Sequence, residues 1–261
     1  MIDKTVKSAD EALADVFGGA SIHIGGFSEP ASCPNDLLAA LVRSGVGDLT
    51  IITNDAARGR GYIERMRAEV EAADPSASFD GVLPLPEWFI PVGVLVETGQ
   101  VRRAITSAGG ELKGGRETAA EGLIRQGVME VELVSQGTLA ERIRAGRVGM
   151  PAFYSAVGVG TFTTEGKEVR MFDGRPYVLE TALRADFALI AADKADRFGN
   201  LTYRGSARTM NGVMAGAATV TIAEVNEIVA PEAMDPDRIN TPGVYVDRVV
   251  LREHRVDEAG R

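Results

Sequence analysis

Glycine and carboxamide residues gather at four predicted strand ends, where they could bind a polar ligand. The turns contain Gly25-Gly26, Asn54, Gln136-Gly137 and Gly158 to Gly160. Neutral N–H donors in such turns suit a carbonyl or carboxylate group, because they stabilise negative charge on oxygen. Gln136 follows a valine-rich run at the carboxyl end of a predicted parallel strand, where open α/β sheets bind ligands. Its local sequence alone favours a surface-turn glutamine. These turns supply donors but no reactive atom.

The reactive groups of common hydrolases, metal enzymes and dinucleotide enzymes are missing from the sequence. His23 alternates with isoleucines in a predicted strand, and His254 lies in a polar carboxyl-terminal tail. Neither histidine is placed beside a serine nucleophile or a second type of metal ligand, so no metal site is expected. The sequence contains no G-x-S-x-G elbow, no Walker loop and no G-x-G-x-x-G loop, and VGVGTF at 157–162 has only G-x-G.

Composition narrows the possible partners and the cellular compartment. The 261 residues are 45% hydrophobic and 25% charged, as in ordinary globular proteins. A formal net charge of -9 argues against nucleic acid as a partner, because phosphate backbones recruit an excess of basic residues. No apolar run approaches the roughly 20 residues that a membrane helix needs. The amino terminus has no export signal and Cys33 is a single cysteine, so we expect a cytoplasmic protein.

Alternating strands and helices are expected to position these residues. Strands are predicted at 20–24, 49–53, 102–106, 131–134, 185–191, 220–225 and 245–251, with helices at 8–16, 34–42, 91–99, 117–126 and 211–218. A further helix after Gln136 carries Leu139 and Ile143 on its apolar face, and Thr138 with Glu141 fits a capping box at its start. The pattern predicts an α/β fold, with an open, mostly parallel sheet flanked by helices.

Two segments depart from this alternation. Residues 168–172 and 177–179 flank Asp173-Gly174, a strong hairpin signal, so a small antiparallel excursion is expected. The charged residues at 193–197 are interpreted as a solvated turn. We expect a single domain over 1–261 with an atypical insertion at about 59–88.

Several longer phrases resemble one known family. ELVSQGTLAERIRAG, MPAFYSAVGVGT, KADRFGNLTYRGSAR, VTIAEVNEIV and DPDRINTPGVYVDRV are similar to the alpha (A-type) subunits of family I CoA-transferases that act on 3-oxoacids. GGF at 25–27 resembles the family's signature loop. The similarity runs through Ser8 to Thr53 and from about Gln100 to Val250. It implies an open α/β fold and a homologous beta (B-type) subunit, with α2β2 assembly.

The resemblance also implies a division of chemical roles. Family members form a glutamyl-CoA thioester on a glutamate of the beta subunit, within a Ser-Glu-Asn-Gly motif that this sequence lacks. Gln136 matches the family's oxyanion-stabilising glutamine and becomes the candidate catalytic residue. Gly25, Gly26, Phe27, Asn54, Gly137, Gly158 and Gly160 become candidate substrate-binding residues. The substrates are an acyl-CoA thioester and a small carboxylic acid, with no resident cofactor.

Departures from the family pattern keep other functions open. The loop GGFSEPASCP is about one residue longer than usual and has Ser32 where glycine is expected, and Asn54-Asp55 replaces a pair of asparagines. Glu29 suggests an internal nucleophile, although a solvated loop glutamate is the favoured interpretation. The leading hypothesis is the alpha subunit of a succinyl-CoA:3-oxoacid CoA-transferase, with 3-oxoadipate or acetoacetate as acceptor. The alternatives are an acyl-CoA hydrolase or ring-opening subunit, and a non-catalytic metabolite-binding module, which leaves QGTLAERIRAG unexplained.

Overall fold

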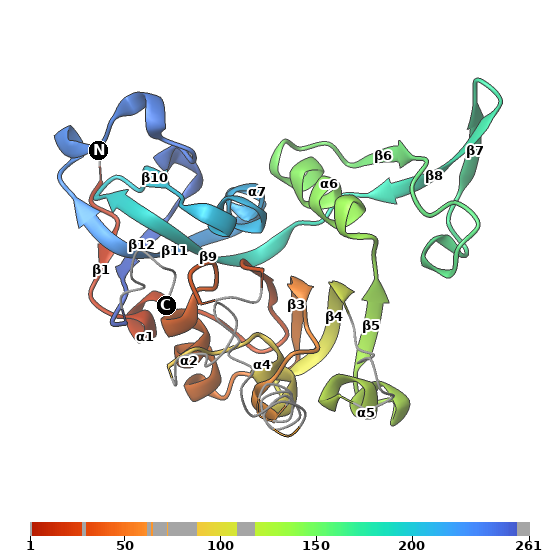
Figure 1. Ribbon diagram of the computed structural model, residues 1–261, viewed down its shortest axis with the longest axis horizontal. Helices are drawn as coiled ribbons and strands as arrows, with labels where there is room; N and C mark the ends of the chain where they lie inside the picture. Colours follow the sequence, from red (N-terminus) through yellow and green to blue (C-terminus); the bar gives the residue numbers. More distant parts are fainter. Residues whose placement is uncertain are drawn as a thin grey trace.

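A parallel sheet forms the centre of the molecule. The computed structural model describes residues 2–27, 30–61, 64, 72, 88–108 and 118–254. Within them the main sheet has nine strands in the order β1-β12-β11-β9-β2-β3-β4-β5, and β10 pairs with β9 (Figure 1). The β10–β9 pair is antiparallel and the other neighbours are parallel. The strands are β1 (Thr5–Val6), β2 (Ser21–Ile24), β3 (Leu49–Asp55), β4 (Val101–Ala108), β5 (Glu130–Leu133), β9 (Ala185–Asp196), β10 (Leu201–Thr202), β11 (Ala218–Val229) and β12 (Arg248–Leu251).

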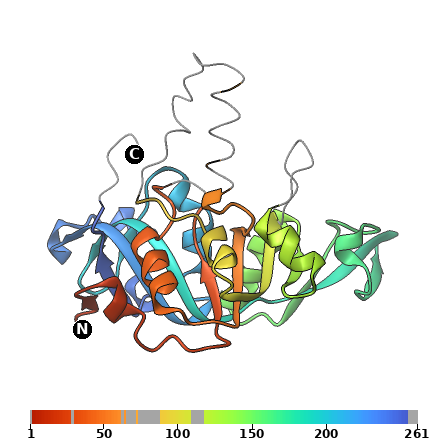
Figure 2. The same ribbon diagram turned by 90° about the horizontal axis from the view of Figure 1, so that it is seen from below.

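Helices cover both faces of this sheet. One hydrophobic core lies under α1, α2 and α4, and a second lies under α6 and α7. Figure 2 views the molecule from the side that carries α2 and α4. The helices are α1 (Ala9–Ala12), α2 (Asn35–Ser44), α4 (Gly93–Glu97), α5 (Ala119–Arg125), α6 (Gln136–Arg147) and α7 (Met210–Met214). Short 3-10 helices are η1 (Phe162–Thr164), η2 (Gly205–Arg208), η3 (Pro231–Ala233), η4 (Pro236–Arg238) and η5 (Gly243–Tyr245).

The two longest strands are apolar because both of their faces are covered. β9 and β11 pair in parallel from Ala185 with Ala218 to Asp196 with Val229. Parallel strands buried on both faces carry nearly continuous runs of small and branched apolar residues, as these two do. The runs identified in the sequence at 185–191 and 220–225 are therefore the middle of the sheet.

The predicted antiparallel excursion is present as a second, three-stranded sheet. Its order is β6-β8-β7, from β6 (Ala152–Ser155), β7 (Val169–Phe172) and β8 (Arg175–Thr181). Asp173 and Gly174 both have positive φ, at 49° and 75°, as a two-residue hairpin turn requires. Figure 1 shows this sheet projecting to one side of the main sheet. The predicted fold class is confirmed.

The predicted capping box at the start of α6 is wrong. α6 begins at Gln136 with Ser135 as its N-cap, so Thr138 already lies inside the first turn and is buried. Glu141 instead forms an ion pair with Arg144 on the helix surface, at 2.9 Å. A capping box does occur at α5, where Thr118 and Glu121 exchange hydrogen bonds with each other's backbone N–H groups.

The interpretation of 193–197 as a solvated turn is also wrong for most of its residues. Residues 193–196 continue β9 beyond the predicted strand end. Asp196 is only 2% exposed. Its carboxylate accepts from the N–H groups of Phe198 and Asn200, at 2.9 and 3.0 Å, and so builds the turn from inside the protein.

Part of the predicted organisation cannot be placed. Glu29 and most of the insertion at 59–88 lie outside the described residues. In the described part of the chain, no helix combines the length and apolar character needed to cross a membrane.

Candidate active site

The predicted site residues of the main sheet meet at one edge. Ile24 of β2 is in register with Thr53 of β3, Thr53 with Thr106 of β4, and Thr106 with Leu133 of β5. These strands are parallel, so the residues that follow them emerge at the same carboxyl edge of the sheet. Gly25, Asn54 near the end of β3 and the turn before Gln136 therefore lie at these carboxyl ends, which is where open α/β sheets bind ligands.

Two carboxamides are in direct contact at this edge. Gln136, the first residue of α6, donates from Nε2 to Oδ1 of Asn54 at 2.7 Å. Asn54 is 7% exposed, whereas the Gln136 side chain is exposed. An Nε2 group has two hydrogens, so one remains for a ligand. The pair can present neutral N–H donors to an oxygen that gains negative charge.

Hydroxyl groups of β4 support Asn54 from behind. Ser107 Oγ lies 2.9 Å from Oδ1 and 2.8 Å from the main-chain oxygen of Asn54. Thr106 Oγ1 donates to the same main-chain oxygen at 3.1 Å. Neither residue was identified from the sequence, because the contacts depend on the register between β3 and β4.

The charge of Asp55 is matched locally. Its carboxylate accepts from the Ala57 N–H group at 2.9 Å and pairs with Arg58 at 3.0 Å. Asp55 stands where the family pattern has a second asparagine, and Arg58 balances the negative charge that Asp55 adds. The N–H donors of Asn54 and Gln136 can therefore still bind an anionic oxygen.

Gly25 and Gly26 have no room for a side chain. A Cβ on Gly25 would collide with the Asn211 carboxamide, and one on Gly26 would meet Cys33 Sγ at 2.6 Å. Gly26 also has φ of +112°, which L side chains rarely adopt. Phe27 follows with 39% of its surface exposed, and its N–H group donates to Ser32 Oγ at 2.9 Å. The close packing fixes the course of the loop past the sheet edge.

A buried group of polar side chains holds this loop, and we call Asn211, Glu224 and Arg252 the polar frame. Asn211 accepts from the Ala191 N–H group at 2.8 Å and donates to the main-chain oxygen of Ser32 at 2.9 Å. It is fully buried. Asn211 thus joins α7, β9 and the loop after β2.

The charged half of the polar frame holds the far end of the same loop. Arg252 donates to the main-chain oxygen of Cys33 at 2.6 Å and pairs with Glu224, which accepts from the Leu37 N–H group at 2.9 Å. Burial raises the pKa of the Glu224 carboxyl, and the adjacent Arg252 guanidinium opposes that rise. This ion pair was not predicted from the sequence. A signal was available, because a glutamate within the apolar run VTIAEV needs a buried partner.

The remaining predicted glycines lie elsewhere or are less constrained. Gly137 is in the first turn of α6, and a Cβ there would meet no atom within 4 Å. Gly158 and Gly160 lie in the loop between β6 and η1, and β6 belongs to the small sheet rather than to the main sheet. Both have positive φ, at 77° and 78°. Their role in substrate binding stays a prediction.

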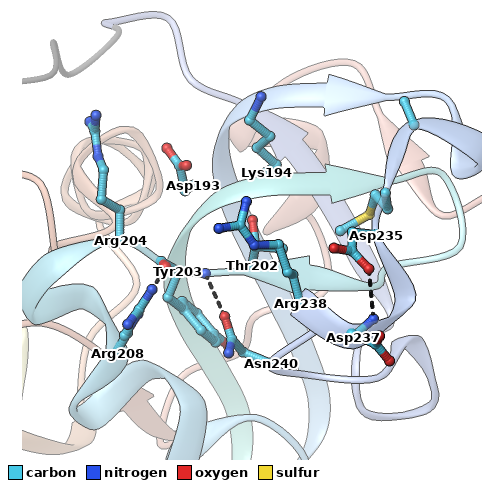
Figure 3. Close-up of a pocket in the computed structure, with 12 residues that line it drawn as sticks. Asp193, Lys194, Thr202, Tyr203, Arg204, Arg208, Asp235, Asp237, Arg238 and Asn240 are labelled. Atoms are coloured by element: carbon cyan, nitrogen blue, oxygen red, sulfur yellow. Dashed lines mark hydrogen bonds between the residues drawn. The ribbon is translucent and has the colours of Figure 1, made fainter.

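A separate depression of about 530 Å³ lies where β9 and β10 end (Figure 3). Its lining includes Lys194, Arg204, Arg208 and Arg238, but also Asp193, Asp235 and Asp237. Lys194 is neutralised further by Glu227, at 2.7 Å. The mixed charges do not favour an anion, so this depression is a weaker candidate for a carboxylate substrate than the amide-bearing edge. In the described ranges, no group of three or more histidine, cysteine, aspartate or glutamate residues could hold a metal ion.

Known proteins resemble this chain over nearly its whole length. A family model described as coenzyme A transferase matches residues 6–73 and 87–252. The A-type subunit of succinyl-CoA:3-ketoacid coenzyme A transferase from Xanthomonas campestris pv. campestris is 42% identical over 259 residues, covering 98% of this chain and 93% of that protein. The A-type subunit of 3-oxoadipate CoA-transferase from Pseudomonas putida is 40% identical over 250 residues, covering 96% and 94%. The structure of glutaconate coenzyme A-transferase from Acidaminococcus fermentans has a TM-score of 0.71 at 21% identity, covering 95% of this chain and 75% of that one. This last likeness concerns the fold alone.

Proposed function

The chain belongs to the coenzyme A transferase family, and we propose that it is the alpha subunit of a succinyl-CoA:3-oxoacid CoA-transferase. We propose 3-oxoadipate or acetoacetate as the acceptor; one relative is named for 3-oxoadipate and another for a 3-ketoacid, the class to which acetoacetate belongs. The observation that carries the proposal is the contact between Gln136 and Asn54 at the sheet edge. It provides donors for a carbonyl oxygen, while the Ser-Glu-Asn-Gly motif is absent from the sequence.

The proposed reaction divides its groups between two chains. A glutamate of the beta chain attacks the thioester carbonyl of succinyl-CoA, and coenzyme A leaves as a thiolate to give a mixed anhydride. The thiolate then attacks the glutamyl carbonyl and releases succinate, which leaves a glutamyl-CoA thioester. The acceptor acid takes the coenzyme A by the reverse sequence. Each addition places negative charge on one oxygen, and Gln136 and Asn54 donate to it. One such donor contributes about 2.7–4 kcal/mol to lowering the barrier.

A single substitution tests the role of Gln136. In the complex with its beta subunit, Gln136→Ala should lower kcat about 10²- to 10³-fold, with little change in assembly. Gln126→Ala is a matched control, because Gln126 is an exposed glutamine at the end of α5. Acyl exchange between succinyl-CoA and 3-oxoacids measures kcat, and size-exclusion chromatography measures assembly. Normal turnover by an intact Gln136→Ala complex would overturn the assignment.

The hydrolase alternative differs in its need for an acceptor. A transferase releases succinate from succinyl-CoA steadily only when a 3-oxoacid is present, whereas a hydrolase uses water. Adding and omitting acetoacetate or 3-oxoadipate therefore separates the two functions.

The proposal includes the state of the enzyme in the cell. We place an α2β2 complex in the cytoplasm, using coenzyme A thioesters as substrates and no resident cofactor. The relatives are named as one of two kinds of subunit, which supports a beta partner. Light scattering of the co-purified pair measures the stoichiometry, and cell fractionation checks the compartment. Metal analysis and an absorption spectrum of the active complex check for a resident metal or organic cofactor.

A further inference from the structure

The orientation of the Asn54 carboxamide matters for catalysis because its two ends have opposite roles. Oδ1 can only accept hydrogen bonds, whereas Nδ2 can only donate them. The two ends have nearly the same shape, so packing alone does not select which end faces the substrate. Hydrogen-bonding neighbours must make that selection.

Two side chains converge on the oxygen end. Gln136 Nε2 lies 2.7 Å from Oδ1, and Ser107 Oγ lies 2.9 Å from the same atom. With both donors on Oδ1, Nδ2 points away from them. The Asn54 side chain is mostly buried, which makes a wrongly oriented amide costly.

The single Ser107 proton has two acceptors available to it. The second is the main-chain oxygen of Asn54, at 2.8 Å. Thr106 Oγ1 lies 3.1 Å from that main-chain oxygen and 3.1 Å from the main-chain oxygen of Ala108. When the Thr106 proton points to Asn54, the main-chain oxygen keeps a donor and the Ser107 proton is available for Oδ1.

We propose that Ser107 is a positioning residue that holds the Asn54 carboxamide with Oδ1 toward Gln136 and Nδ2 toward the reacting oxygen. Asn54 and Gln136 then present N–H groups to one developing negative charge. This inference rests on the proposed CoA-transferase function. It adds a residue on β4 that touches no substrate and acts through Asn54.

A double-mutant cycle in the complex with the beta subunit tests the proposal. Ser107→Ala should lower kcat about 3- to 10-fold, the loss of one ordinary hydrogen bond, with KM for succinyl-CoA nearly unchanged. Ser107→Cys, which puts a slightly larger and weaker donor in the same place, should lose less than Ser107→Ala. In an Asn54→Ala background, Ser107→Ala should change kcat less than about 2-fold, because the group it orients is gone.

Controls separate positioning from a general structural effect. Ser44→Ala removes a hydroxyl whose proton caps the main-chain oxygen of Leu41 at the end of α2, and it should leave kcat unchanged. An equal loss from Ser107→Ala with and without Asn54 would overturn the proposal, as would wild-type turnover of Ser107→Ala. If Gln136→Ala and Asn54→Ala also turn over normally, the proposed function itself fails. If only Ser107→Ala is normal, this inference alone fails.

Discussion

Two glycine loops that look alike in the sequence are held in very different ways. The loop after β2 contains Gly25 and Gly26, and Asn211 and Arg252 bind its main-chain oxygens from other parts of the chain. In the loop after β6, Thr161 and Thr164 donate to the main-chain oxygen of Gly158, each at 2.7 Å and within a few residues. The first loop is part of the buried framework of the sheet, and the second is a local surface turn.

The surroundings differ as much as the hydrogen bonds. Glycines of the first loop pack against buried side chains, whereas a Cβ on Gly160 would meet nothing within 4 Å. Large apolar side chains of this region are exposed, with Phe162 of η1 73% exposed and Met171 of β7 59% exposed. Glycine at a strand end is thus a weak indicator of rigidity. The stability of the loop conformation depends on how deeply the groups around the glycine are buried.

The largest expected effect comes from breaking the polar frame. Arg252→Met should lower the free energy of unfolding by about 3–5 kcal/mol, because it leaves the buried Glu224 carboxylate without its partner. Urea denaturation measures this loss. Adding Glu224→Gln to the same chain removes the unpaired charge and should recover part of it. A single variant as stable as wild type would mean that the ion pair does not hold the loop.

Acidification tests the sheet beneath the same loop. His23 lies on β2 between Ile52 and Ala188 of the neighbouring strands, and burial lowers its pKa from 6.5 to about 4. As the pH falls below 6.5, His23 therefore binds a proton in the unfolded chain before it does so in the folded protein. His23 contributes stability above pH 6.5 and loses that contribution progressively down to about pH 4, a change of roughly 3 kcal/mol.

The measurement for His23 compares two pH profiles. Unfolding free energies of wild type and His23→Leu are determined from about pH 7 to 4, so that the effects of other groups cancel in the difference. The wild-type curve should fall more steeply than that of the variant across this window. Parallel curves would show that His23 is not held neutral.

Local patterns predicted the sheet edge but not the polar frame. The apolar run at 49–53 predicted β3, and the geometry of parallel strands then brought Asn54 close to Gln136. Arg252 meets Glu224 only because β12 lies beside β11, a contact that depends on register between distant segments.

Side-chain capping did not decide where α6 starts. Ser135 and Thr138 are both good N-cap residues by type, but Ser135 occupies the N-cap without a side-chain capping hydrogen bond. The helix starts earlier, which lets Thr138 and Leu139 pack inward against the sheet. Tertiary packing therefore decided the boundary.

A methyl group at Gly25 tests the tight packing of the first loop. Gly25→Ala should lower the free energy of unfolding by about 1–3 kcal/mol, because the Asn211 carboxamide must move from its buried hydrogen bonds. Gly137→Ala is the matched control: it has open space in a helix and should be neutral or slightly stabilising. Thermal unfolding of both variants shows whether the loss of stability comes from the tight packing at Gly25 or from replacing any glycine. Equal losses of stability in the two variants would mean that packing at Gly25 is not the cause.

The smallest effect is expected in the loop after β6. Gly160→Ala should cost only about 1 kcal/mol, the strain of placing an L side chain at φ of +78° with no steric neighbour. Asparagine tolerates this conformation better, so Gly160→Asn should cost less than Gly160→Ala. Thermal unfolding measures both variants beside Gly25→Ala. If Gly160→Ala were as destabilising as Gly25→Ala, or Gly160→Asn were the worse of the pair, the loop after β6 would be held by more than its local turn.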